Sequence, residues 1–222
     1  MTRTGADARP DLEERTQSAI EWLRAHTRLV GVVVGVILAA AVGVWFYGEW
    51  RDRRETNAAR ALSDAQVAMS QNNSALAQNE LRRLITRYEG TTAARQGRLL
   101  MAHLHYRAGR FQEGIDELAR LARRTDQDLR DGAVQGLMAA GYEQLGKLTE
   151  AAQHYRDAAQ AARFPEDRDS YLANAARVLS VAGKNAEAVQ IWQELAARED
   201  SPVSAEARVR LGELQASAAR GS

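Results

Sequence analysis

The stretch QLGKLTEAAQHY, residues 144–155, decides the fold of this chain. Related stretches stand on either side of it, as RAGRFQEGIDEL at 107–118 and VAGKNAEAVQIW at 181–192. Each has a glycine near its start, polar residues after it, and a large apolar residue at its end. Self-similarity at a fixed interval is the signature of a repeat architecture.

The spacing of the glycines gives the length of the repeat. Gly109, Gly146 and Gly183 are 37 residues apart each time, and one more step back reaches Asn72, in SQNNSALAQNEL at 70–81. Asparagine tolerates the left-handed backbone conformation that glycine adopts easily at the end of a helix. The interval therefore predicts four repeats, each a hairpin of two helices that turns at these residues.

Three further positions keep the same interval. Small residues stand seven before and five after each turn residue, and large apolar residues stand nine after it: Ala65, Ala102, Ala139 and Ala176; Ala77, Gly114, Ala151 and Ala188; Leu81, Leu118, Tyr155 and Trp192. Small residues let two helices cross closely, and a large residue one turn on fills the space between hairpins. A single hairpin cannot bury its apolar face, so the hairpins are expected to stack into a solenoid.

The predicted fold is all-α. The hairpins pair 57–70 with 74–88, 91–108 with 111–123, 129–145 with 148–162, and 168–182 with 186–198. A capping helix follows from Pro202. We therefore expect a repeat domain over 57–218 and a frayed tail at 219–222.

The stretch LVGVVVGVILAAAVGVWFY, residues 29–47, has no charged residue. As a helix it spans roughly 28 Å, close to the ~30 Å hydrocarbon core of a bilayer. A signal peptide cleaved after 39–41 and a buried soluble helix are alternatives, but the charged segment before the stretch is too long and too acidic for a signal peptide. We expect a transmembrane helix at 29–48. A tail with a short amphipathic helix, 1–28, precedes it, and a juxtamembrane linker, 49–56, follows it.

Small residues recur every four positions within this span, at Gly31, Gly35, Ala39 and Gly43. At helical spacing they form one smooth ridge, against which a second membrane helix could pack closely. The alternative is ordinary use of glycine and alanine in a helix that faces lipid.

Composition and motifs argue against several classes of function. The net charge is only +1, which gives no electrostatic reason to bind nucleic acid, and the absence of cysteine excludes thiolate chemistry. His103 and His105 are two residues apart on a predicted helix and point away from each other. Neighbouring carboxylates, such as Glu166 and Asp167, stand at expected helix starts. We therefore expect no enzyme activity, no cofactor and no metal site.

Function then depends on the surface. The first helices of stacked hairpins line the concave groove of a solenoid. The residues expected to face a partner there are Gln66, Met69, His103, Tyr106, Arg107, Glu143, Gln144 and Arg177. Such a mixed groove suits a helix or an extended segment of another protein.

The order of small residue, glycine turn, EA pair and aromatic residue resembles the tetratricopeptide repeat family, most closely in GYEQLGKLTEAAQHYRDAA at 141–159. That family usually repeats every 34 residues, so this chain carries three more per repeat. The usual proline after the second helix is mostly missing.

The arrangement of an amphipathic segment, a glycine-rich span and RDRRETNAARALSDAQVAM at 51–69 resembles the bacterial ancillary subunit of the Sec translocon. That resemblance implies a single-pass protein of the inner membrane with a cytoplasmic N-terminus and periplasmic repeats. It also implies contacts with the translocation channel and with periplasmic chaperones or translocating polypeptides. The flanking arginines, three after the span at Arg51, Arg53 and Arg54 against Arg24 and Arg28 before it, slightly favour the opposite orientation.

The expected function is thus a membrane-anchored scaffold for protein interactions. Two alternatives stay open: a structural homo-oligomer of the cell envelope, and a receptor whose repeats face the cytosol.

Overall fold

The computed structural model describes residues 27–123 and 132–220. Within these ranges the chain is helical, with no strand. The predicted amphipathic helix in 1–28 and the segment 124–131 lie outside the described residues, apart from Thr27 and Arg28. The chain divides into two compact units, Met1–Arg54 and Glu55–Ser222.

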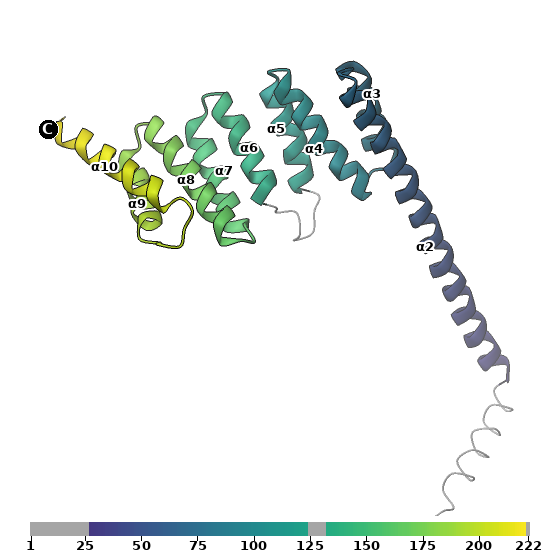
Figure 1. Ribbon diagram of the computed structural model, residues 1–222. Coiled ribbons are helices and arrows are strands. Elements are labelled where there is room, and N and C mark those ends of the chain that lie inside the picture. Colours follow the sequence, from purple (N-terminus) through teal and green to yellow (C-terminus); the bar gives the residue numbers. More distant parts are fainter. Residues whose placement is uncertain (1–26, 124–131, 221–222) are drawn as a thin grey trace, which may run out of the picture. The chain divides into compact units, whose positions relative to one another are not determined.

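Outside the segment 124–131, the helices follow one another with short connections. Their bounds are α2 (Thr27–Ser70), α3 (Ser74–Arg87), α4 (Thr92–Arg107), α5 (Phe111–Arg123), α6 (Gly132–Gln144), α7 (Leu148–Ala161), α8 (Pro165–Val181), α9 (Asn185–Ala196) and α10 (Ser204–Arg220). From α3 to α10 each helix packs against the next, and the hairpins stand side by side in chain order (Figure 1). The prediction of an all-α solenoid is confirmed.

The four turns share one geometry. Asn72, Gly109, Gly146 and Gly183 have φ of 55°, 71°, 70° and 75°, as the interval of 37 residues predicts. At each turn the next residue donates its backbone N–H to a carbonyl five residues earlier, as Lys147 does to Tyr142 at 2.9 Å. This bond satisfies a carbonyl that the end of the first helix leaves open.

The close crossings also lie where the interval places them. All four alanines seven residues before the turns are at most 2% exposed. The residues five and nine after the turns are buried as well. The core is therefore built from small contacts at helix crossings and one large side chain per hairpin.

Two caps fix the start of α4. Thr91 accepts the backbone N–H of Ala94 at 3.1 Å, and Glu55 of α2 accepts that of Thr92 at 3.2 Å. Because the first N–H groups of a helix have no intrahelical acceptor, a carboxylate stabilises them well. Glu55 thus ties the second half of α2 to the following hairpin.

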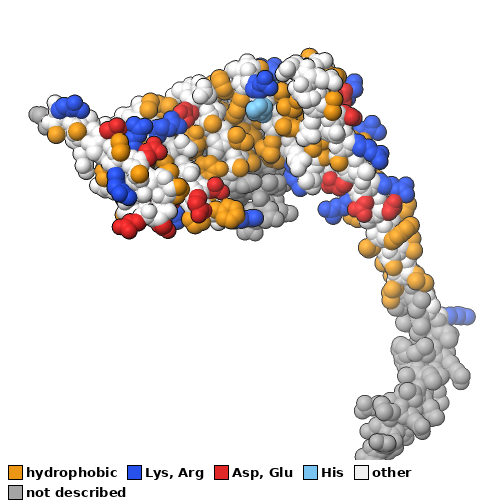
Figure 2. Space-filling model, viewed as in Figure 1, with side chains coloured by type: hydrophobic (Ala, Val, Ile, Leu, Met, Phe, Trp, Pro, Cys, Tyr) orange, Lys and Arg blue, Asp and Glu red, His pale blue; other side chains and the backbone are white. Residues whose placement is uncertain are grey.

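The apolar stretch lies in the first half of α2. From Gly35 to Phe46 every residue is exposed, and Figure 2 shows apolar side chains gathered along this part of the helix. In the described parts of the chain, no helix is both long and apolar enough to cross a membrane. The side chains of Leu29, Val30, Val33 and Val34 lie outside the described set. The span at 29–48 remains a prediction.

At the other end, α10 packs on α9, in the place expected for the capping helix. Its backbone is helical through Arg220, so it includes Ala219 and Arg220 of the tail expected to fray. The remaining residues of that tail, 221–222, lie outside the described residues.

Candidate protein-interaction groove

The predicted groove residues stand on the first helices of the hairpins, α2, α4, α6 and α8, but they are not equivalent. Four are exposed, namely Gln66, His103, Arg107 and Gln144. The other four, Met69, Tyr106, Glu143 and Arg177, are half-buried and contact other parts of the repeats.

Tyr106 fills space between hairpins. Its hydroxyl donates to the backbone carbonyl of Leu137 at 3.0 Å, and its ring lies 5.8 Å from that of Phe111. Glycines make this possible, because a Cβ at Gly114 or Gly141 would come within 2.3 Å of Tyr106. Burial raises the pKa of the Tyr106 phenol well above its usual range. Tyr106 therefore holds the second and third hairpins together.

Glu143 and Arg177 form an ion pair between the third and fourth hairpins. Nη1 and Nη2 of Arg177 donate to the two carboxylate oxygens of Glu143 at 2.8 and 3.1 Å. The hydroxyl of Tyr155 donates to the same carboxylate at 3.2 Å. The hydrogen bond from Arg177 lowers the pKa of Glu143, and burial raises that of Tyr155 to about 12. The two groove charges thus satisfy each other.

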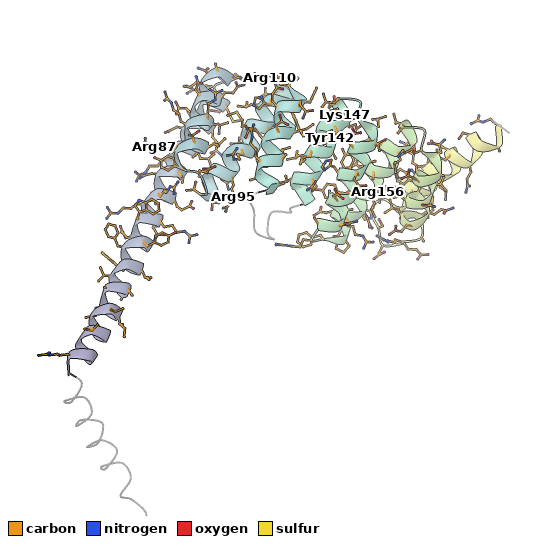
Figure 3. The ribbon with its side chains drawn as sticks, turned by 180° about the vertical axis from the view of Figure 1, so that it is seen from behind. Arg87, Arg95, Arg110, Tyr142, Lys147 and Arg156 are labelled. Carbon is orange, nitrogen blue, oxygen red and sulfur yellow. The ribbon has the colours of Figure 1, made fainter. Side chains whose placement is uncertain are left out.

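A second polar cluster lies where α6 meets α7. The rings of Tyr142 and His154 stack at 4.9 Å, and Nζ of Lys147 lies 5.8 Å from the centre of the Tyr142 ring. Figure 3 shows Tyr142 and Lys147 next to each other at the turn. His154 Nδ1 lies 2.8 Å from the Gln135 amide oxygen, and burial lowers the pKa of this imidazole.

Sequence reasoning missed the exposed apolar residues of the groove helices. Val181 is 69% exposed and Leu137 is 43% exposed. A hollow of about 500 Å³ lies beside Val181, lined also by Arg177, Trp192 and Leu214. Val181 stands two residues before its turn glycine, as Arg107 and Gln144 do, so the repeat interval could have identified it.

The ridge residues of the predicted span lie on α2. A Cβ at Gly31, Gly35 or Gly43 would meet no atom within 4 Å, so the space beside these glycines is open. Ala39 is exposed on the same helix.

The described residues contain no cluster of three or more His, Asp or Glu side chains suited to a metal ion.

The repeat geometry agrees with comparison to known sequences. The pattern of the family described as "Tetratricopeptide repeat-like domain" matches residues 21–168. The chain belongs to this family. No curated protein matches the sequence.

Solved structures share the family fold. Tetratricopeptide-like repeats of a kinesin light chain from Podosopora anserina align with a TM-score of 0.57 and 16% identity, over 75% of this chain and 90% of that one. A tetratricopeptide repeat protein from Parabacteroides merdae gives 0.59 and 13%, over 73% and 61%. BtubC from P. vanneervenii gives 0.54 and 14%, over 76% and 84%. At such identities the likeness concerns the fold alone.

Proposed function

We propose that this protein is a membrane-anchored scaffold that binds other proteins through its tetratricopeptide-like repeats. The observation that carries the proposal is the contrast along α2. Its second half enters the core of the repeats at Ala58, Leu62 and Ala65, whereas its first half exposes a continuous run of apolar side chains. A soluble surface rarely leaves such a run uncovered, and a bilayer would cover it.

The groove suggests how a partner is held. Because Glu143 and Arg177 neutralise each other, this part of the groove offers little free charge to a ligand. The exposed side chains of Leu137 and Val181 instead offer apolar contact area. Such a surface favours an apolar face of a helix or an extended segment.

For the partner and the compartment we rely on the resemblance to the ancillary Sec translocon subunit. We propose that the N-terminus is cytoplasmic and that the repeats are periplasmic. The protein would then link the translocon, or another inner-membrane complex, to periplasmic chaperones or translocating polypeptides. The repeat fold is typically non-catalytic, which agrees with a scaffold.

Photo-crosslinking in native membranes tests the groove. A photoreactive residue in place of Gln144 on α6 is expected to crosslink a translocon subunit or a periplasmic chaperone. Gln153 on the second helix α7 is the matched control, since it is also an exposed glutamine and donates to Asp157 of the same helix. Equal crosslinking from both positions would contradict a role for the groove.

Anchoring and orientation have their own tests. The full-length protein is expected to stay in membranes after alkaline carbonate washing, and a mature N-terminus near Val42 would instead show cleavage. Protease added to spheroplasts should digest the repeats but spare an epitope fused before Asp11. The opposite protection pattern would favour the receptor that faces the cytosol.

The homo-oligomer is the second candidate, favoured by the open space beside Gly31, Gly35 and Gly43. Replacing Gly35 and Ala39 with leucine should weaken contact with a partner helix, because bulk keeps helices apart. Loss of self-crosslinking would support an oligomer, and loss of translocon co-purification would support the scaffold.

A further inference from the structure

Two hollows lie side by side on α3, α4 and α5. Their volumes are about 260 and 360 Å³, and both are lined by Ile85, Arg98 and Arg120. Arg95 also lines the smaller hollow and Arg82 the larger one. We call these four arginines, with Ile85 between them, the arginine surface.

Ion pairs satisfy the middle of the arginine surface. Nη1 of Arg98 donates to Glu117 at 2.9 Å, and Arg120 pairs with the other oxygen of the same carboxylate. Arg98 also lies 3.9 Å from a carboxylate oxygen of Glu89. Two arginines and two glutamates therefore balance each other here.

The two ends carry excess positive charge. Arg82 donates to the amide oxygen of Asn79 at 3.2 Å, and Arg95 donates to the hydroxyl of Thr92 at 3.0 Å. Both acceptors are neutral, and in the described part of the chain no carboxylate lies within 4.0 Å of either guanidinium. Among the described residues, the four arginines of this surface stand beside two carboxylates, and the two arginines without an ion pair stand one in each hollow.

This surface is separate from the groove described above. On α4 the larger hollow is lined by His105, whereas the groove residue is His103. Two residues are about 200° apart around a helix, so these side chains leave α4 in nearly opposite directions. A partner on the arginine surface would leave the groove free.

We propose that the arginine surface binds an acidic segment of a protein, which places one carboxylate on Arg82 and another on Arg95. The planar guanidinium fork matches a carboxylate in two parallel hydrogen bonds. Ile85, common to both hollows, is 9% exposed, so it forms part of the apolar floor between them. A single phosphate would need cations that converge on one hollow, whereas here the spare cations occupy different hollows.

The test measures binding of a fluorescent peptide that contains glutamates separated by leucines to the full chain in neutral detergent. The Arg82→Gln/Arg95→Gln variant is expected to bind roughly fivefold more weakly, since each lost contact is a partly exposed ion pair. The control is Arg208→Gln/Arg220→Gln, which also removes two arginines that donate to neutral acceptors, here two exposed ones on α10. The control should bind as the native protein does.

Further arms separate the acidic segment from other anions. A control peptide with glutamine in place of each glutamate should bind weakly to every variant. Inorganic phosphate should compete with the acidic peptide no better than chloride does at equal ionic strength. Equal loss in both double variants would mean non-specific charge attraction and overturn the proposal. Full competition by phosphate would also overturn it, in favour of a simple anion site. Circular dichroism of both variants verifies that the helices are intact.

Discussion

The most apolar stretch of the chain and the core of its repeats differ in how far their side chains are buried. In the first half of α2, Trp45 is 69% exposed, whereas in α9 Trp192 is 1% exposed. The same holds for small residues, since Ala40 is exposed and Ala151 is fully buried.

The difference teaches that burial here follows spacing and not local hydrophobicity. The repeats are rich in alanine and charge, yet they bury a core because small and large residues recur at an interval that matches the stacked hairpins. The apolar half of α2 lacks this interval, and its residues from Gly35 to Phe46 are exposed in the structure. In the function proposed above, a bilayer or a second helix would cover them.

The largest expected effect comes from removing a buried tryptophan. Trp192→Ala should lower the free energy of unfolding by about 3–5 kcal/mol, because it leaves a cavity in the last hairpin. Trp45→Ala should leave the stability of the repeats unchanged. Urea unfolding of the full chain in neutral detergent, followed by circular dichroism, measures both. Equal losses would break the comparison between the two regions.

Overpacking should come next. Ala151→Leu places a large side chain at a closed helix crossing and is expected to cost about 1–3 kcal/mol. Ala40→Leu is the matched control, since its side chain enters open space. An unmoved urea midpoint for Ala151→Leu would show that the assigned repeat register is wrong.

Replacing a turn glycine should have a smaller effect on the stability of the repeats. Gly146→Ala forces a Cβ into the left-handed region, at φ of 70°, and should destabilise the repeats by roughly 1 kcal/mol. Gly35→Ala lies within a helix, with open space around it and outside the unit that holds the repeats, so it should not destabilise them. Thermal midpoints of the two variants compare them directly, and a neutral Gly146→Ala would count against the turn geometry.

The smallest effect concerns the Glu143–Arg177 pair. A double-mutant cycle with Glu143→Gln and Arg177→Gln should give a coupling of about 0.5–1 kcal/mol, since the pair is partly exposed. Arg177 lowers the pKa of Glu143 in the folded state, so this stabilisation is complete above the pKa of an unfolded glutamate, about 4.3. This stabilisation is lost as the pH falls through the lower pKa that Glu143 has in the folded state.

Stability measured from pH 7 to 3 checks that dependence. Glu143→Gln should reduce the loss of stability on acidification relative to the native protein. An unchanged pH profile would mean that the pair contributes nothing to folding.

The sequence by itself determined the turns and the crossings. Glycine and asparagine adopt a positive φ more readily than other residues do. The residue types at Asn72, Gly109, Gly146 and Gly183 therefore indicate the turns without any knowledge of the packing around them. Close crossings likewise admit only small residues. Both constraints act at single positions, and the interval of 37 residues makes them visible.

The tertiary structure alone decided which side chains meet. Gly136 would weaken an isolated helix, but a Cβ there would come 2.6 Å from Tyr171, so the glycine admits the neighbouring ring. Tyr106, predicted from the sequence to face a partner, also holds two hairpins together. Arg177 reaches Glu143, whereas Arg82 reaches no described carboxylate. Such pairings depend on the relative rotation of stacked hairpins and on side-chain rotamers, which no single position in the sequence encodes.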